Sequence, residues 1–154
     1  MCREEVTVQI HRLAGNEDLP LPQYQTTEAA AMDLHAAVGE PIRLLPGEIV
    51  LVPCGFSLAV PRGFEAQVRP RSGLATGSGI AVVNSPGTIY SDYRGEVKVA
   101  LINLGKKAFS VERGMRVAQL LITRVPLVIW EVVAELPVTA RGEGGFGHTG
   151  RGQA

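Results

Sequence analysis

The feature that most constrains the fold is an alternation of apolar and polar residues with a period of two, which recurs along the chain. Residues 6–11 and 64–69 alternate in this way, and 96–99 do so ahead of the apolar run 100–103. Such alternation is typical of strands with one buried and one exposed face. Further extended runs lie at 48–52, 115–125 and 127–133. Turn signals that contain Pro or Gly separate these runs, so the sequence predicts an all-β sandwich or barrel.

Composition sets the size and chemical class of the molecule. The chain has 154 residues, of which 45% are hydrophobic, and this suits one globular domain. Only 5% are aromatic, so aliphatic side chains must fill most of the core. Lys and Arg total 15, as do Asp and Glu. The chain therefore lacks the positive net charge with which many proteins bind the phosphates of nucleic acids, so no nucleic-acid partner is expected.

The number of cysteines and the hydropathy of the sequence indicate the cellular compartment in which the chain is expected. It has 2 cysteines, too few for the disulfide framework of a small secreted domain, so a cytoplasmic location is expected. The first residues lack the continuous apolar stretch of a signal peptide. No apolar run reaches the roughly 20 residues that cross a bilayer, so no membrane partner is expected. Cys54 is expected to be a small buried apolar residue.

Some segments carry local expectations of their own. Residues 72–76 are expected to form a short helical turn with Ser72 as its N-cap. Residues 115–122 have helix propensity, but their β-branched flanks and the nearby turns favour a strand. Apolar residues on both faces of 100–103 indicate a strand that enters a core or an interface. Trp130 is expected in the core or an interface because its surroundings are apolar.

Four segments combine glycine with arginine, serine or aspartate in a way that core packing does not require. They cover residues 29–37, 69–75, 84–97 and 141–151. Together they supply flexible backbone N–H donors, guanidinium groups and an aromatic side chain. Backbone amides in glycine-rich turns and guanidinium groups both bind phosphate oxygens. The four segments therefore predict a nucleotide-binding site.

These segments also carry a family resemblance that spans most of the chain. The motifs occur in the order A-x-D-L at 31–34, PRSGLA at 70–75, a hairpin ending in DYRGE at 84–96, RGMRVAQL at 113–120 and RGxGGFGxTG at 141–150. In these motifs the chain resembles the trimeric dUTPases, the deoxyuridine triphosphate nucleotidohydrolases. The resemblance implies hydrolysis of dUTP to dUMP and pyrophosphate with Mg²⁺, a reaction that limits uracil in DNA and supplies dUMP.

The resemblance also implies an architecture. It predicts a jelly-roll-like β-barrel or sandwich with one short helix over residues 1–139. A flexible, glycine-rich arm over 140–154 is expected to close over the active site. The molecule is expected to be a homotrimer whose active sites are shared between subunits. By composition alone the arm is a solvated tail, and its ordering on substrate is implied by the resemblance only.

By resemblance, the hairpin binds the nucleoside part of dUTP. Uracil is received largely through main-chain hydrogen bonds, close enough to exclude the methyl group of thymine. Tyr93 packs against the deoxyribose and leaves no room for a 2′-hydroxyl. The residues assigned to this part of the substrate are Asn84, Gly87, Thr88, Ile89 and Tyr93. Lys98 is assigned to substrate binding without a particular part of the substrate.

Other motifs are implied to bind the triphosphate. Arg71, Ser72 and Gly73 hold phosphates, and Gln119 adds a further hydrogen bond. Asp33 lies near the hydration shell of the metal and helps to fix groups of a neighbouring subunit. The Mg²⁺ ion is bound through substrate phosphates and water, without direct protein ligands. The arm contributes Arg141 at the γ-phosphate, Phe146 over the uracil, and Gly144, Gly145, Gly147, His148 and Thr149 around the phosphates.

One position departs from the family pattern. Where the family has the aspartate that orients and deprotonates the attacking water, this chain has Tyr90. A phenol with a reference pKa of ~10 is a poor base near neutral pH. In an extended strand Asp92 projects from the same face, but it is displaced by roughly 6.6 Å, beyond direct proton transfer. The sequence therefore predicts a chain that binds dUTP and hydrolyses it slowly.

Two other function classes stay open. A related deaminase of dCTP shares the implied fold and uses a glutamate to activate water, but the corresponding position here is Ala100. A non-catalytic dUTP-binding protein would signal through ordering of the arm, and Tyr90 is the feature that favours it. His11 and His35 have no second His or Cys at ligand spacing, so they are expected to be surface or hydrogen-bonded polar residues rather than zinc ligands.

Overall fold

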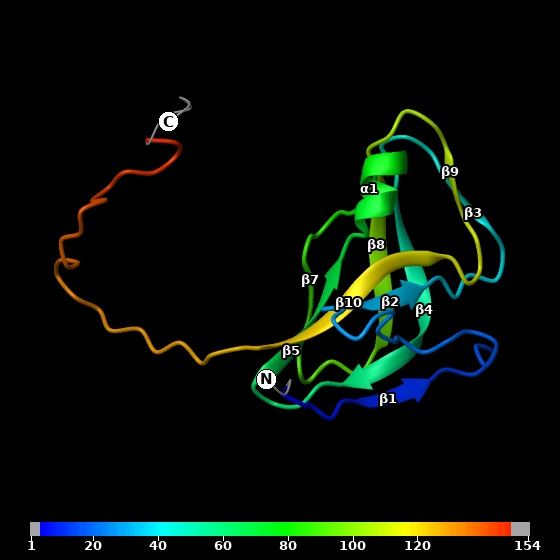
Figure 1. Ribbon diagram of the computed structural model, residues 1–154, viewed down its shortest axis with the longest axis horizontal. Helices are drawn as coiled ribbons and strands as arrows, with labels where there is room; N and C mark the ends of the chain where they lie inside the picture. The colour runs from blue at the N-terminus through cyan, green and yellow to red at the C-terminus, as the bar shows by residue number, and fades with distance from the viewer. Residues whose placement is uncertain (1–3, 149–154) are drawn as a thin grey trace.

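The computed structural model describes residues 4–148, which form ten strands and one short helix (Figure 1). The first sheet has the order β1-β4-β8-β6 and consists of β1 (Gln9–Arg12), β4 (Ile49–Ala59), β8 (Glu96–Asn103) and β6 (Ile80–Val82). The second has the order β2-β10-β5-β7 and consists of β2 (Met32–His35), β10 (Arg116–Arg124), β5 (Phe64–Arg69) and β7 (Gly87–Ile89). A ribbon of β3 (Ile42–Leu44) and β9 (Phe109–Val111) completes the structure. All these pairings are antiparallel, and the predicted all-β, jelly-roll-like class is confirmed.

Aliphatic side chains from the two sheets form the core. In β8, Val97, Val99 and Leu101 are at most 1% exposed. The alternate residues Ala100 and Ile102 are only half-buried, because successive side chains of a strand point to opposite faces. The outer face of β8 is therefore apolar at Ala100 and Ile102, as the sequence predicts for 100–103, whereas Glu96 and Lys98 make its first half polar.

Helix α1 (Ser72–Ser78) connects β5 to β6 and so passes from the second sheet to the first. Arg71 holds the N-cap position in an extended conformation, and no side chain caps this end. The expectation that Ser72 is the N-cap is therefore wrong, since Ser72 is already helical. The helix ends at Gly79, where φ is 71° and a Cβ would collide with the backbone of Gly105. Within residues 4–148, no helical segment has the length and hydropathy that a membrane crossing requires.

Strand β10 is the inner strand that places two functional motifs side by side. Its extended conformation confirms the prediction of a strand, rather than a helix, for residues 115–122. It pairs with β2 on one side and with β5 on the other. Gln119 faces Asp33 in β2 and Arg69 in β5. Polar residues from three distant segments therefore lie in one row across the sheet.

Beyond β10 the chain leaves the sheets. Residues 125–148 contain no strand and run away from the two sheets (Figure 1). The strand predicted over 127–133 is therefore wrong for the single chain, where no neighbouring strand pairs with this segment. Trp130, expected in a core or an interface, is 87% exposed. The division at residue 139 stays a prediction, although the sheets already end at Arg124.

Cys54 lies in β4 and is buried, as the sequence predicts. Burial raises the pKa of its thiol to about 12. Because the thiolate is the reactive form, a thiol with so high a pKa is inert near neutral pH. Cys54 therefore belongs to the packing of the core rather than to a reactive site.

Candidate functional site

The segment between β6 and β8 borders two adjoining hollows. The smaller one has a volume of about 110 Å³ and is bounded by residues of β4, β5, β7 and β8. Its lining comprises Leu51, Val68, Val82, Asn84, Gly87, Thr88, Ile89, Lys98 and Ala100. The polar groups in this lining come from the hairpin and from β8, whereas aliphatic side chains form the rest. The smaller hollow can therefore take a compact ring that is apolar on its faces and polar at its edge.

The larger hollow has a volume of about 350 Å³. It is lined by Leu51, Thr88, Ile89, Tyr90, Tyr93, Glu96 and Lys98. Since the two hollows share Leu51, Thr88, Ile89 and Lys98, they form one continuous depression, which we call the nucleoside hollow. The five hairpin residues that the sequence assigned to the nucleoside line this depression, and so does Lys98, which was assigned to the substrate in general.

Short hydrogen bonds fix the walls of the nucleoside hollow. The Ser85 hydroxyl donates to the Val82 carbonyl at 2.6 Å and holds the turn that leads into β7. At the other end of β7, the Tyr93 amide donates to the Tyr90 carbonyl at 3.1 Å. The Tyr93 hydroxyl donates to the Glu96 carbonyl at 3.0 Å. The hairpin is therefore formed without help from a ligand.

Tyr90 lies at the rim of the nucleoside hollow, with 68% of its surface exposed. The expectation that Asp92 shares a strand face with Tyr90 is wrong, because β7 ends at Ile89 and residues 90–93 form a turn. Asp92 lines a separate hollow instead. Among the described residues, Glu96 supplies the only carboxylate in the lining of the nucleoside hollow.

A second polar cluster, which we call the arginine cluster, consists of Asp33, Arg71 and Arg116. The Asp33 side chain is 11% exposed and forms ion pairs with Arg71 Nε at 3.0 Å and Arg116 Nη1 at 3.3 Å. Arg71 Nη1 also donates to the Arg116 carbonyl at 3.3 Å. The two guanidinium groups thus compensate the charge of one nearly buried carboxylate. The ion pair with Asp33 and the hydrogen bond to the Arg116 carbonyl hold Arg71 in a fixed orientation. Sequence reasoning missed Arg116, although its place in the RGMRVAQL motif was a usable signal.

The other residues assigned to the phosphates surround the same loop. The Gln119 side-chain amide donates to the Pro70 carbonyl at 2.8 Å and so ties β10 to this loop. Ser72 and Gly73, which follow Arg71, are exposed at the start of α1. The structure therefore gathers Arg71, Ser72, Gly73 and Gln119, the predicted phosphate-binding residues outside the arm, around one loop.

The arginine cluster and the nucleoside hollow lie at opposite edges of the second sheet. In the order β2-β10-β5-β7, β2 carries Asp33 and β7 carries Thr88 and Ile89. Neighbouring strands of a sheet lie ~4.8 Å apart, so the three spacings from β2 to β7 separate these edges by about 14 Å. Asp33 and the hairpin strand therefore lie on different edges of the second sheet.

His35 lies beside the arginine cluster and was not assigned to the site from the sequence. It faces Arg116 across the pairing of β2 with β10. Its Nδ1 is buried and has no hydrogen-bond partner within residues 4–148, so the expectation of a surface or hydrogen-bonded histidine is wrong for this atom. Burial lowers the pKa of the imidazole, so the ring is neutral at pH 7.

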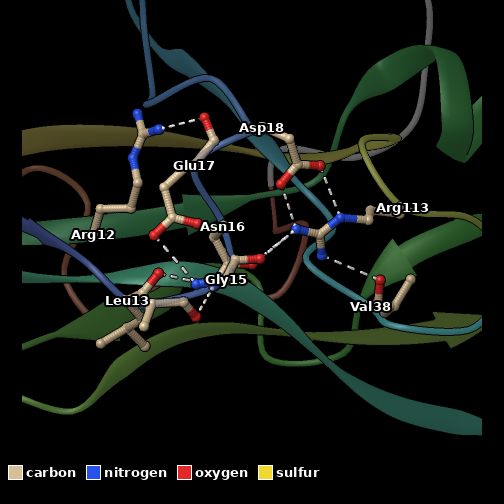
Figure 2. A network of polar contacts seen from close by, with 9 residues as sticks. Arg12, Leu13, Gly15, Asn16, Glu17, Asp18, Val38 and Arg113 are labelled. Carbon is tan, nitrogen blue, oxygen red and sulfur yellow. Dashed lines mark hydrogen bonds and ion pairs between the residues drawn. The ribbon is translucent and has the colours of Figure 1, made fainter.

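Arg113 joins three loops in a network that sequence reasoning also missed (Figure 2). Its Nε and Nη2 bind the two carboxylate oxygens of Asp18 at 2.9 and 2.7 Å. Nη2 also donates to the Gly15 carbonyl at 2.9 Å, and Nη1 to the Val38 carbonyl at 3.3 Å. The hydrogen bond from Arg113 lowers the pKa of Asp18. The network anchors the turn that leads into β10.

The predicted arm residues lie apart from both clusters in the single chain. Arg141, Gly145, Phe146, Gly147 and His148 are exposed, and their segment runs away from the sheets (Figure 1). Thr149 lies outside the described residues. The proposed closure of the arm over the nucleoside hollow therefore stays a prediction.

Comparison with known proteins places this geometry in context. The model of the dUTPase family matches residues 17–150. The chain is 54% identical to the deoxyuridine 5′-triphosphate nucleotidohydrolase of Wolbachia pipientis subsp. Culex pipiens, over 98% of this chain and 100% of that protein. It is 56% identical to the protein of the same name from Rhizobium johnstonii, over 94% of each chain.

Solved structures share the fold at lower identity. The dUTPase of Staphylococcus bacteriophage 80alpha with dUpNHpp superposes with a TM-score of 0.84 at 23% identity, over 94% of this chain and 98% of that one. A mutant dUTPase from phage phi11 of S. aureus, described with a structural Mg(II) ion, superposes with a TM-score of 0.74 at 19% identity, over 84% of this chain and 97% of that one. These likenesses support the jelly-roll-like fold.

Proposed function

Because the chain belongs to the dUTPase family, and is by that relation a dUTP nucleotidohydrolase, we propose that it binds dUTP in the nucleoside hollow and hydrolyses it slowly. The products are dUMP and pyrophosphate. The observation that carries the proposal is that the five predicted nucleoside-binding residues and Lys98 all line one depression. The proposed setting is the cytoplasm, which fits the free and buried Cys54.

The nucleoside part of dUTP occupies the hollow in a defined direction. Uracil enters the smaller part, whose volume of about 110 Å³ favours a single pyrimidine ring over a purine. The deoxyribose then lies in the larger part beside Tyr93, whose ring is held by the hydrogen bond of its hydroxyl to Glu96. A ring fixed in this way rejects the additional 2′-hydroxyl of a ribonucleotide by steric contact.

The phosphates extend from the hollow toward the arginine cluster of another copy of the chain. Arg71 is held by the nearly buried Asp33, so its guanidinium group needs little reordering to bind a phosphate. Ser72 and Gly73 offer exposed groups next to it, and Gln119 lies on the same loop. The separation of about 14 Å between sheet edges supports a site shared between copies.

Magnesium fits this site through the substrate rather than through a protein cage. Within residues 4–148, no group of three or more His, Cys, Asp or Glu side chains lies close enough to hold a metal ion. Both oxygens of Asp33 already contact guanidinium groups. Mg²⁺ keeps several waters and takes oxygens from phosphates, so it neutralises charge on the triphosphate without a dedicated protein site.

A homotrimer would cover two apolar surfaces that the single chain leaves open. The outer face of the first sheet exposes Ile49 by 59% and Leu51 by 57%. The segment that leads from β10 to the arm exposes Leu127 by 91% and Val132 by 95%. Contiguous apolar surface of this kind marks a protein interface. We propose that the arm packs on a neighbouring copy and carries Phe146 to its nucleoside hollow.

The chemical step requires a water molecule that attacks the α-phosphorus while the bond to the bridging oxygen breaks and pyrophosphate leaves. Tyr90 stands where the family has the carboxylate that accepts the proton of this water. A positioned general base contributes typically ~10²–10⁴ in rate. Tyr90 therefore slows the reaction while most binding contacts persist.

The experiment that tests the proposal compares four nucleotides as substrates. We expect pyrophosphate and dUMP from dUTP, and no product from dTTP, UTP or dCTP, after long incubation with Mg²⁺ and stoichiometric protein. Ammonia release from dCTP would instead identify a deaminase, which the absence of a carboxylate at Ala100 argues against. Failure of calorimetry to detect binding of dUpNHpp would contradict the proposal as a whole.

A second candidate function is a dUTP-binding protein without turnover, and the exposed Tyr90 is the observation that favours it. In that case dUTP would be recovered intact from the incubation although it binds. Ordering of the arm on binding would then be the output of the molecule. Hydrolysis of dUTP above the rate without protein decides against this candidate.

A further inference from the structure

Two tyrosines line the larger part of the nucleoside hollow, and their hydroxyl groups differ. The Tyr93 hydroxyl donates to the Glu96 carbonyl at 3.0 Å. The Tyr90 hydroxyl makes no hydrogen bond within residues 4–148, and the side chain is 68% exposed against 45% for Tyr93. Tyr93 is therefore part of the wall, whereas Tyr90 presents an uncommitted neutral donor at the rim.

Lys98 supplies the positive charge of the same depression. Its ammonium group lies 3.9 Å from a carboxylate oxygen of Glu96, at the outer limit of an ion pair, and its side chain is 44% exposed. A long, exposed pair of this kind binds weakly, so the ammonium group can turn to an anion in the hollow. Leu51 and Ile89 form an apolar floor beside it.

The hollow combines an apolar floor, a hydroxyl donor and a cation whose ion pair with the Glu96 carboxylate is long, and a ligand with an anion next to an apolar ring can compete for that cation. We propose that the Tyr90 hydroxyl and the Lys98 ammonium group together hold the phosphate that adjoins the deoxyribose. This inference rests on the proposed function, because it takes the nucleoside as the occupant of the hollow. It assigns Tyr90 a binding role that is separate from the loss of a general base.

The assignment has a consequence for the product. A carboxylate at position 90 would repel the dianion of dUMP, whereas a phenol attracts it through an O–H···O⁻ hydrogen bond. The outer phosphates leave as pyrophosphate, but the phosphate adjoining the sugar stays within reach of Tyr90 and Lys98. The chain therefore retains dUMP after hydrolysis, and dUMP competes with dUTP for the site.

Calorimetry on the full-length chain and on Tyr90→Phe tests this role. The probes are deoxyuridine, dUMP and dUpNHpp. A hydrogen bond to a charged group contributes about ten- to a hundred-fold to affinity, so we expect Tyr90→Phe to lower the affinity for dUMP by that factor. Deoxyuridine, which has no phosphate, should bind both proteins equally. Lys98→Gln should also weaken the binding of dUMP and reduce its salt dependence.

Tyr24→Phe is the matched control, because Tyr24 is also half-exposed, at 51%, and lines a different groove. It should leave the affinity for all three probes unchanged. Equal dUMP affinity in Tyr90→Phe and the unchanged chain would overturn the inference, as would a parallel loss of deoxyuridine binding. If neither dUMP nor dUpNHpp binds the unchanged chain, the proposed function itself fails. The two failures are therefore distinguishable.

Discussion

The nucleoside hollow and the C-terminal arm differ in how much of their structure one chain provides. The hollow is bordered by β4, β7, β8 and a hydrogen-bonded turn, and its residues are in place without a ligand. Residues 125–148, which comprise the start of the arm and the segment that leads to it, expose most of their apolar side chains and form no strand. The difference teaches that the depression is formed by one fold alone, whereas the proposed closure of the site calls for contacts that the single chain does not make.

Deletion of residues 126–154 is the strongest way to break this comparison. We expect kcat/KM for dUTP to fall at least about a hundred-fold, because the arm groups that position the phosphates are lost. Sedimentation should show a lighter species, while calorimetry still detects deoxyuridine. Deletion of residues 151–154 alone, beyond the last motif, is the control. Full turnover in the longer deletion would show that the arm has no part in the site.

A pair of leucine substitutions sharpens the contrast between core and arm. Leu101→Ala removes a side chain with 0% exposure, and we expect a loss of about 2–5 kcal/mol in the free energy of unfolding. Leu127→Ala, at 91% exposure, should change it by less than about 0.5 kcal/mol in the unassembled chain and weaken assembly instead. Denaturant titration and sedimentation measure the two effects. Equal destabilisation by both substitutions would contradict the account.

The Arg113 network predicts a pH dependence for the stability of the sheets. The pKa of Asp18 is lowered below its ordinary 3.8 by the hydrogen bond from Arg113. The pair therefore stabilises the fold above the unfolded-state pKa, and this contribution disappears as the pH falls through the folded-state value. In unfolding titrations from pH 7 to pH 2, the free energy of unfolding should decrease less with falling pH for Asp18→Asn than for the unchanged chain. Glu131→Gln, in the arm, should leave the slope as it is.

The reactivity of the Cys54 thiol is the measurement with the smallest expected effect, and it depends only on the packing of the core. In a Cys2→Ser chain, Cys54 should not react with a disulfide reagent at pH 8, because burial raises its pKa to about 12. Reaction should become complete when denaturant unfolds the sheets. Stoichiometric labelling of the folded chain would show that the first sheet opens more readily than its packing implies.

Most of the fold followed from the sequence because strand periodicity is a local property. Residues 64–69 and 96–103 alternate as their burial does. The strand expected over 127–133 failed since pairing needs a neighbour that this chain lacks. Ser72 was assigned to the N-cap by residue type, whereas the helix begins one residue earlier, after an extended Arg71 and without a side-chain cap.

The site was predictable where one motif contains it and not where contacts cross the chain. The hairpin residues from Asn84 to Tyr93 are close in sequence, so a motif could identify them. Arg116 and the network around Arg113 depend on partners more than 70 residues away. The placement of Asp92 failed because a turn, rather than an extended strand, follows Ile89.

Steady-state release of pyrophosphate from dUTP by the unchanged chain and by Tyr90→Asp tests the central claim most directly. The account predicts that the aspartate variant turns over ~10²–10⁴ times faster, because it regains a base that can activate water. Both proteins should bind dUpNHpp in the nucleoside hollow. Equal rates in the two proteins would contradict the claim that position 90 controls the chemistry of this site.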